Sequence, residues 1–167
     1  TLGGRFALVI GNGDYMELGR LKNPAADARD VSAELEKLGF DVETLIDADL
    51  PTMEEAVIRF GNRLSTSKKA IGFFFYAGHG VQSGGVNYLI PADARIPTES
   101  YLKTKALSAQ AVLDTMQEAK NELNIVVLDA CRDNPFSWAR SGTRGLSVVG
   151  IQPPGSIVVY STSAGRV

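Results

Sequence analysis

The sequence contains a single cysteine and a single histidine among its 167 residues. An internal disulfide needs two cysteines, and a tetrahedral zinc site draws its ligands mainly from Cys and His, so neither is expected. Any thiol chemistry must therefore pass through Cys131, and any imidazole chemistry through His79.

Long hydrophobic runs and an excess of positive charge are also missing. Stretches such as 6–10 and 73–77 fall far below the roughly 20 apolar residues that span a bilayer, so no membrane helix is expected. The 17 Lys and Arg residues are scattered and balanced by 19 Asp and Glu, which gives a net charge of −2. The sequence lacks the basic patch of a nucleic-acid-binding protein, and we expect no nucleic-acid partner.

The rest of the composition is typical of one folded domain. Hydrophobic residues make up 44% and charged residues 22%, close to the averages for soluble globular proteins. A chain of this length can bury a sizeable core but is short for two domains.

Apolar runs and helical periodicity alternate along the chain. The buried-strand or alternating patterns cover 5–11, 40–46, 70–77, 125–130 and 156–162, and helical spacing covers 24–38, 52–64 and 108–120. This order predicts an α/β fold with a mainly parallel sheet and helices on both of its faces.

Three local signals refine this prediction. Asn23 followed by Pro24 favours a helix start, and Thr52 with Glu55 predicts a capping box for the next helix. The pair at 84–85, Gly-Gly between two valines, predicts a small hairpin on the rim of the sheet. The segment 134–155, rich in Pro, Gly, Ser and Arg, predicts a long loop.

His79 and Cys131 directly follow two of the predicted strands. Ligands of open α/β sheets bind beyond the carboxyl ends of the strands, so both residues are expected at the binding edge. A thiol is a good nucleophile as thiolate, and a nearby imidazole can remove its proton. The alternative is structural, since a lone Cys after an apolar strand is often a buried small hydrophobe. Gly78 and Gly80 favour the functional interpretation, because glycine allows close backbone approach.

Two segments resemble the motifs of a known family. Residues 73–80 (FFFYAGHG) and 127–133 (VLDACRD) are similar to the His and Cys motifs of the caspase-like cysteine peptidases, which include caspases, metacaspases and paracaspases. The separation of 131 − 79 = 52 residues agrees with a caspase His about 50 residues before its Cys. Residues 5–12, 21–31 and 87–92 extend the resemblance over most of the chain, which looks most like the bacterial metacaspase-like or paracaspase-like domains.

The resemblance implies a three-layer caspase-like fold and a Cys-His dyad. Cys131 would attack the scissile carbonyl, His79 would transfer the leaving-group proton, and the amides of Gly80 and Cys131 would form the oxyanion hole. Caspase-like domains continue beyond a fifth strand. We therefore expect residues 1–167 to be a single peptidase domain that lacks its C-terminal part.

The residue two positions before the cysteine departs from the caspase pattern. A caspase reads Gln-Ala-Cys-Arg-Gly, whereas this chain carries Asp129 at that position. Asp27 lies in 23–30 (NPAADARD), which resembles the metacaspase and paracaspase segment that supplies an acid to the S1 pocket. Two carboxylates in one pocket favour a basic P1 side chain, Arg before Lys. Each acid could instead have a structural role. Asp27 would be a first-turn acid favoured by the helix dipole, and Asp129 would be a strand-end carboxylate that caps a loop.

No metal or cofactor is expected. Asp41, Asp47 and Asp49 match no EF-hand spacing, and we attribute them to solvated strand ends. Residues 11–13 (Gly-Asn-Gly) lack the Walker lysine and the third glycine of the dinucleotide fingerprint, which favours a tight turn over a phosphate loop.

The sequence thus predicts an endopeptidase that cleaves after Arg or Lys. The alternatives are a catalytically idle caspase-like scaffold and a small nucleotide-binding domain. Peptides or proteins are the expected substrates, a C-terminal fragment of the same protein is an expected partner, and homodimerisation stays open. Arg140 and Arg144 in the long loop are expected sites of self-processing. The chain begins with Thr1 and not with Met, which leaves the compartment open: the cytoplasm is slightly favoured, and the periplasm or cell exterior is the alternative if a leader was removed.

Overall fold

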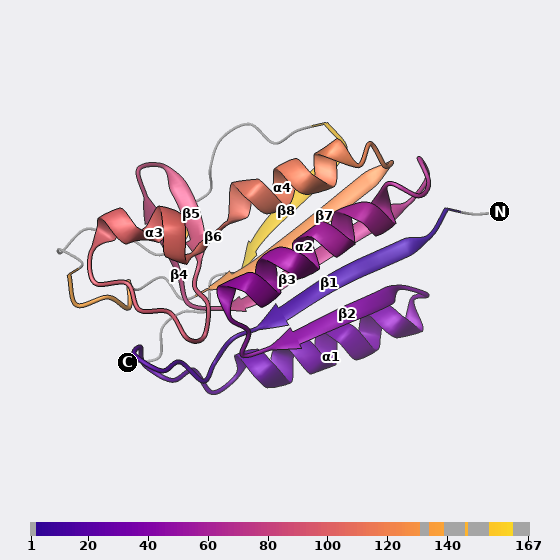
Figure 1. The fold of residues 1–167 in the computed structure, drawn as a ribbon. Coiled ribbons are helices and arrows are strands. Elements are labelled where there is room, and N and C mark those ends of the chain that lie inside the picture. The colour runs from indigo at the N-terminus through magenta and orange to yellow at the C-terminus, as the bar shows by residue number, and fades with distance from the viewer. Residues whose placement is uncertain (1–2, 131–133, 139–145, 147–153, 162–167) are drawn as a thin grey trace.

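A five-stranded parallel sheet forms the centre of the molecule. The computed structural model describes residues 3–130, 134–138, 146 and 154–161. The strand order is β2-β1-β3-β7-β8, and every neighbouring pair is parallel (Figure 1). The strands are β1 (Arg5–Gly11), β2 (Asp41–Ile46), β3 (Ile71–Gly78), β7 (Leu123–Ala130) and β8 (Ser156–Ser161). The predicted mainly parallel α/β fold is confirmed.

Helices cover both faces of this sheet (Figure 1). α1 (Pro24–Lys37) packs on one face through Ala28 and Leu35, against residues of β1 and β3. α2 (Leu50–Leu64) and α4 (Ala109–Glu118) pack on the other face and enclose the larger part of the core with β1, β3 and β7. No helix in the described ranges is long and apolar enough to cross a membrane.

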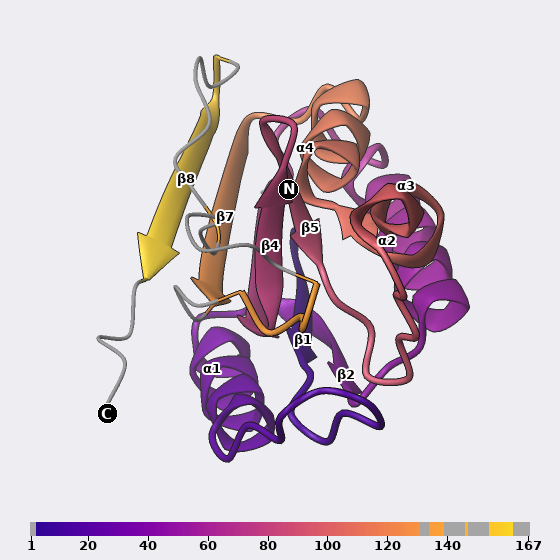
Figure 2. The same cartoon turned by 90° about the vertical axis from the view of Figure 1, so that its left-hand side faces the viewer.

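A second, antiparallel sheet lies at the rim (Figure 2). It contains β4 (Gly80–Ser83), β5 (Val86–Leu89) and β6 (Leu107–Ser108). Gly84 and Gly85 connect β4 to β5 with φ values of +56° and +77°, the conformation of a type I′ hairpin turn. The predicted hairpin is therefore confirmed. The sequence did not predict β6 or the short helices η1 (Glu99–Tyr101) and α3 (Leu102–Lys105).

One predicted helix cap is wrong, and a second stands at the predicted helix start without making a side-chain hydrogen bond. α2 begins at Leu50, and the Asp49 carboxylate accepts a hydrogen bond from the Thr52 N–H at 2.8 Å. Thr52 is therefore a capped residue and not the cap. Asn23 stands at the start of α1, but its backbone is already helical and its side chain makes no capping hydrogen bond. Pro24 has no backbone N–H. Its place in the first turn of α1 therefore leaves one N–H group fewer to be capped.

Candidate active site

The carboxyl ends of β3 and β7 lie side by side. The strand register pairs Gly78 with Ala130 as the last residues of the two strands. His79 follows directly after Gly78, and Cys131 follows Ala130 in the sequence. Cys131 itself lies outside the described residues. The structure thus places His79 at the edge of the sheet where the chain leaves β7.

A main-chain carbonyl orients the His79 ring. The Nε2 atom lies 2.7 Å from the carbonyl oxygen of Gly19, in the segment between β1 and α1. A carbonyl oxygen accepts hydrogen bonds and cannot donate, so Nε2 carries the proton of the neutral ring. The lone pair then sits on Nδ1, which is buried and finds no hydrogen-bond partner among the described residues. This nitrogen is available to accept a proton.

Burial lowers the pKa of His79 below its ordinary value of 6.5, and the hydrogen bond to Gly19 opposes this shift. The residue is 6% exposed. Removing an imidazolium from water disfavours the charged form. The ring is therefore neutral at neutral pH, which is the form that a general base requires.

Two tyrosine hydroxyls fix the main chain of His79. Its N–H donates to the Tyr15 hydroxyl at 2.8 Å, and the Tyr76 hydroxyl donates to its carbonyl at 2.6 Å. The ring of Tyr15 also packs on the imidazole, with centroids 4.5 Å apart. Sequence reasoning missed Tyr15, because nothing in a sequence marks a contact between residues 64 positions apart.

Gly78 is packed too closely for any side chain. A Cβ atom at this position would lie 2.5 Å from the Tyr76 hydroxyl and 2.7 Å from the Tyr15 hydroxyl. The predicted close backbone approach beside His79 is thus present. It lets the two tyrosines reach the main chain of His79.

The amide of Gly80 points away from its partner strand. The ladder bond runs from the Ile90 N–H to the His79 carbonyl, which makes Gly80 and Leu89 a non-hydrogen-bonded pair. A Cβ at Gly80 would lie 3.1 Å from the Cβ of Ala130. Gly80 therefore lies against the end of β7, one residue before the cysteine.

A small pocket brings the two predicted acids together. Asp27, in the first turn of α1, and Asp129, near the end of β7, both line a pocket of about 110 Å³. Asp129 lies on the face of β7 that carries Val127, which is the face packed near α1. The remaining lining residues come from the start of α1, the segment before it and the end of β3: Leu21, Lys22, Asn23, Pro24, Ala77 and Gly78.

Lys22 is a pocket residue that sequence reasoning missed. Its exposed side chain adds one positive charge beside the two carboxylates. An isolated lysine in a polar segment carries no signal that distinguishes it from other solvated lysines. With Lys22, the charged side chains of the pocket sum to one negative charge, which one bound cation would balance.

The other acidic and glycine-rich signals have structural roles. The N–H groups of Gly13 and Asp14 donate to the Asp47 carboxylate at 2.9 Å each, so neither is free to bind a phosphate. The buried Asn12 side chain bonds to Ala48 and Ile90 and holds the same turn. Asp47 and Asp49 thus cap a turn and a helix. Among the described residues, no group of three or more His, Cys, Asp or Glu could hold a metal ion.

Comparison with known proteins identifies the family and the fold independently. A peptidase family model described as a caspase domain matches residues 4–167. The chain is 37% identical over 128 residues to the human mucosa-associated lymphoid tissue lymphoma translocation protein 1, and to its mouse homologue. These 128 residues are 77% of this chain but 15% of each relative, so the chain spans a small part of the length of these curated relatives.

Solved structures share the fold at lower identity. The Drosophila initiator caspase Dronc superimposes with a TM-score of 0.64 at 12% identity, over 98% of this chain and 57% of that structure. A Geobacter sulfurreducens protein gives a TM-score of 0.60 at 20% identity, over 78% of this chain and 52% of that structure. Both support the caspase-like fold.

Proposed function

The chain belongs to the caspase-domain peptidase family, and we propose that it is a cysteine endopeptidase that cleaves peptide bonds after Arg and, less efficiently, after Lys. The observation that carries this proposal is the acidic pocket at the end of β3, directly beside a neutral histidine whose Nδ1 is available. The family supplies the reaction class, and the pocket supplies the specificity.

In the proposed reaction, Nδ1 of His79 takes the proton of the Cys131 thiol. The thiolate attacks the carbonyl carbon of the scissile bond and forms a tetrahedral intermediate, whose oxyanion accepts a hydrogen bond from the Gly80 N–H. The imidazolium then gives its proton to the leaving amine, and a thioester remains on Cys131. Water, deprotonated by His79, hydrolyses this acyl-enzyme and restores the thiol.

The positions of Gly78, Gly80 and Ala130 support this assignment. Gly80 packs against Ala130 at the end of β7, and Cys131 is the next residue in the sequence. Gly80 directs its amide away from β5. The Gly19 carbonyl also stabilises the imidazolium, because it accepts a hydrogen bond from the Nε2–H group of the charged ring.

The two carboxylates of the pocket support a basic P1 residue. Burying two neighbouring carboxylates without a cation is costly, and a guanidinium can bond to both. Asp27, Asp129 and Lys22 together carry one net negative charge, which complements a cationic P1 side chain. The planar fork of Arg engages carboxylates with two parallel hydrogen bonds, which Lys cannot do, so Arg is preferred.

The test compares fluorogenic peptides that end in Arg, Lys or Asp before the reporter group. We expect cleavage in the order Arg, Lys, Asp in the wild-type protein and none in Cys131→Ala. Asp129→Asn should lower kcat/KM for the Arg peptide by about tenfold or more, because a charge-assisted hydrogen bond is lost. Asp14→Asn, which removes an exposed carboxylate outside the pocket, is the matched control and should leave the preference unchanged.

Two outcomes would contradict the proposal. Absence of cysteine-dependent cleavage of every peptide would favour the idle-scaffold alternative. Preferred cleavage of the Asp peptide would retain the dyad but refute the acidic pocket as the P1 site.

The proposal extends to the organisation of the protein. We propose that residues 1–167 belong to a single peptidase domain. Arg140 and Arg144 lie outside the described residues, and they match the proposed P1 specificity as self-processing sites. Intact mass after long incubation, equal for wild-type and Cys131→Ala protein, would refute self-processing.

A further inference from the structure

A second, larger pocket is lined by the two residues that precede Gly19, whose carbonyl holds the His79 ring. It has a volume of about 560 Å³ and is formed by four segments of the chain: Glu17–Leu18 before Gly19, residues 94–97 after β5, Tyr101 with Lys105, and residues 135–138 after the cysteine motif. Nothing in the proposed catalytic machinery uses this pocket.

The segment between β1 and α1 connects the two pockets. Glu17 and Leu18 line the large pocket, the Gly19 carbonyl holds the His79 ring, and residues 21–24 line the acidic pocket. In sequence order, the segment first lines the large pocket, then contacts the imidazole through Gly19, and then lines the acidic pocket. The imidazole thus contacts the residue that separates the two sets of lining residues along this segment.

This order determines which part of a substrate reaches the large pocket. With the P1 side chain in the acidic pocket, the scissile bond lies at His79, which protonates the leaving amine. The half of the substrate that begins with this amine must continue past the imidazole, away from the acidic pocket. Leu18 of the large pocket directly precedes Gly19, which holds the imidazole, so a few residues of an extended peptide, at about 3.3 Å each, would reach this pocket.

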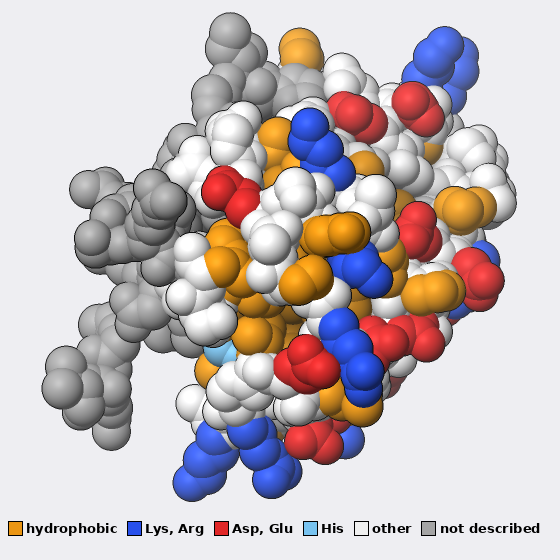
Figure 3. Space-filling view, turned by 60° about the vertical axis from the view of Figure 1, so that its left-hand side comes forward, with side chains coloured by type: hydrophobic (Ala, Val, Ile, Leu, Met, Phe, Trp, Pro, Cys, Tyr) orange, Lys and Arg blue, Asp and Glu red, His pale blue; other side chains and the backbone are white. Residues whose placement is uncertain are grey.

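The wall of the large pocket is aromatic and fixed in orientation. Phe136 and Trp138 stack with centroids 4.8 Å apart and an interplanar angle of 14°. The indole N–H donates to the Ile96 carbonyl at 2.8 Å, which anchors the ring edge. Figure 3 shows hydrophobic side chains gathered on this face of the molecule, with charged side chains around them. A pocket with such a wall favours binding of a ligand's large apolar or aromatic side chain.

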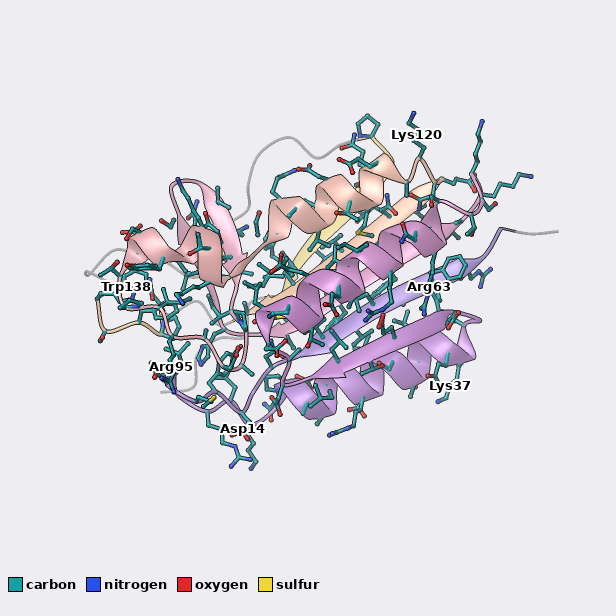
Figure 4. The ribbon with its side chains drawn as sticks, viewed as in Figure 1. Asp14, Lys37, Arg63, Arg95, Lys120 and Trp138 are labelled. Carbon is teal, nitrogen blue, oxygen red and sulfur yellow. The ribbon has the colours of Figure 1, made fainter. Side chains whose placement is uncertain are left out.

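The charged side chains that line the pocket are one acid and two cations. Arg95 and Glu17 form an ion pair at 3.1 Å, and Lys105 adds a further positive charge. Figure 4 shows Arg95 and Trp138 at the same end of the molecule. The lining residues therefore carry an excess of one positive charge, which complements an acidic residue in the ligand.

We propose that the large pocket is a subsite for the leaving half of the substrate, and that it takes a large apolar or aromatic residue next to an acidic one. This inference rests on the proposed peptidase function and extends its specificity beyond the P1 residue. It assigns Trp138 and Phe136 to the recognition of the side chain, and Lys105 to the recognition of the carboxylate.

The first test compares two peptides with the same residues up to the P1 Arg. One continues with Gly-Ser-Phe-Glu and the other with Gly-Ser-Gly-Lys. We expect kcat/KM to be about tenfold higher for the first peptide, a ratio typical of an apolar pocket that gains or loses one large group. Lys105→Glu should lower this ratio several-fold. Lys68→Glu, an exposed lysine in the turn before β3 at the opposite end of the sheet, should keep it.

The second test does not depend on cleavage. Trp138 is the single tryptophan of the sequence, so its fluorescence reports on this pocket directly. Titration with the free tetrapeptide Gly-Ser-Phe-Glu should give a saturable change in emission, and Gly-Ser-Gly-Lys should give a much weaker one. Trp138→Phe, which keeps an aromatic wall, should lose the signal.

The two proposals fail in different ways. Lack of cleavage of both peptides would refute the peptidase proposal, and the fluorescence titration would still decide whether the pocket binds the Phe-Glu sequence. Equal cleavage of the two peptides, or an emission that neither tetrapeptide changes, would refute the subsite.

Discussion

His79 is held by groups of three kinds. A main-chain carbonyl binds its ring, two tyrosine hydroxyls bind its main chain, and an aromatic ring packs on its imidazole. Together they fix the orientation of Nδ1 before any substrate arrives. At the scale of the residue, the site is thus organised mainly around the imidazole.

The lowered pKa of His79 gives a pH dependence of stability with a definite sign. The unfolded chain has an ordinary imidazole, which takes up a proton near pH 6.5, whereas the buried ring takes it up at lower pH. Between these two pH values the unfolded state binds more protons, so the free energy of unfolding falls as the pH is lowered. Above about pH 6.5 this contribution is constant. Urea denaturation at a series of pH values measures it.

His79→Gln is the control for this prediction, because glutamine does not titrate. Its free energy of unfolding should lose less on acidification from neutral pH than that of the wild-type protein. Parallel pH dependence in the two proteins would contradict the lowered pKa.

Tyr15→Phe should impair both stability and turnover. The change removes the hydroxyl that accepts from the His79 N–H and donates to the Ile90 carbonyl, and it leaves the buried His79 N–H without its acceptor. We expect a loss of about 1–3 kcal/mol in the free energy of unfolding. As a positioning residue, Tyr15 should affect kcat more than KM for the Arg peptide. A higher KM with an unchanged kcat would argue against this role. Ser65→Ala, which removes an exposed hydroxyl, is the control.

Sequence reasoning could identify His79, Asp27 and Asp129, because a single imidazole and a motif position define them. The structure brings the two acids to one pocket, while their role in binding stays a prediction. Gly19 could not be predicted, since it acts through a main-chain atom that every residue has. Lys22 was missed because its place in the pocket depends on how the segment before α1 crosses the end of β3.

Helix starts show where local patterns are insufficient at the scale of the element. Ser, Thr, Asp and Asn are all good N-caps, and both Asp49 and Thr52 precede the same apolar stripe. The backbone decides between them. Asp49 is extended, with φ −79° and ψ 169°, which leaves its carboxylate free to reach the Thr52 N–H. The strands and the Gly-Gly hairpin, in contrast, were predictable, because buried runs and type I′ turns have strong sequence signatures.

A pair of variants tests the cap assignment. Asp49→Ala removes a carboxylate that accepts a capping hydrogen bond, whereas Asn23→Ala removes a side chain that makes none. We expect Tm to fall by about 2–4 °C in the first variant and to change little in the second. Thermal denaturation followed by circular dichroism measures both. An equal fall in the two variants would refute the assignment.

At the scale of the whole molecule, the helices cover the sheet unevenly. α1 packs on β1, β2 and β3, and no helix in the described ranges packs over β8 on the same face. Ile157 and Val159 of β8 are accordingly 50% and 46% exposed. An edge strand with apolar side chains on an open face favours association with other chains.

Val159→Lys should therefore reduce self-association at high protein concentration. The side chain is already half exposed, so we expect the free energy of unfolding to change by no more than about 0.5–1 kcal/mol. Light scattering as a function of concentration measures the effect, and Val159→Ile, which keeps the apolar surface, is the control. Unchanged scattering by the lysine variant would show that this face does not drive association.

The contact between Gly19 and His79 also bears on how the protein tolerates change over generations. Apart from its two chain neighbours, no heavy atom of the described residues lies within 4 Å of where a Cβ at Gly19 would stand, so many amino acids fit there and all of them keep the carbonyl that binds the imidazole. A library of variants should thus accept most replacements at this position, yet reject insertions and deletions in the segment, since these shift the carbonyl off the ring. The number of residues in this segment therefore matters more for the contact with His79 than the identity of the residue at position 19.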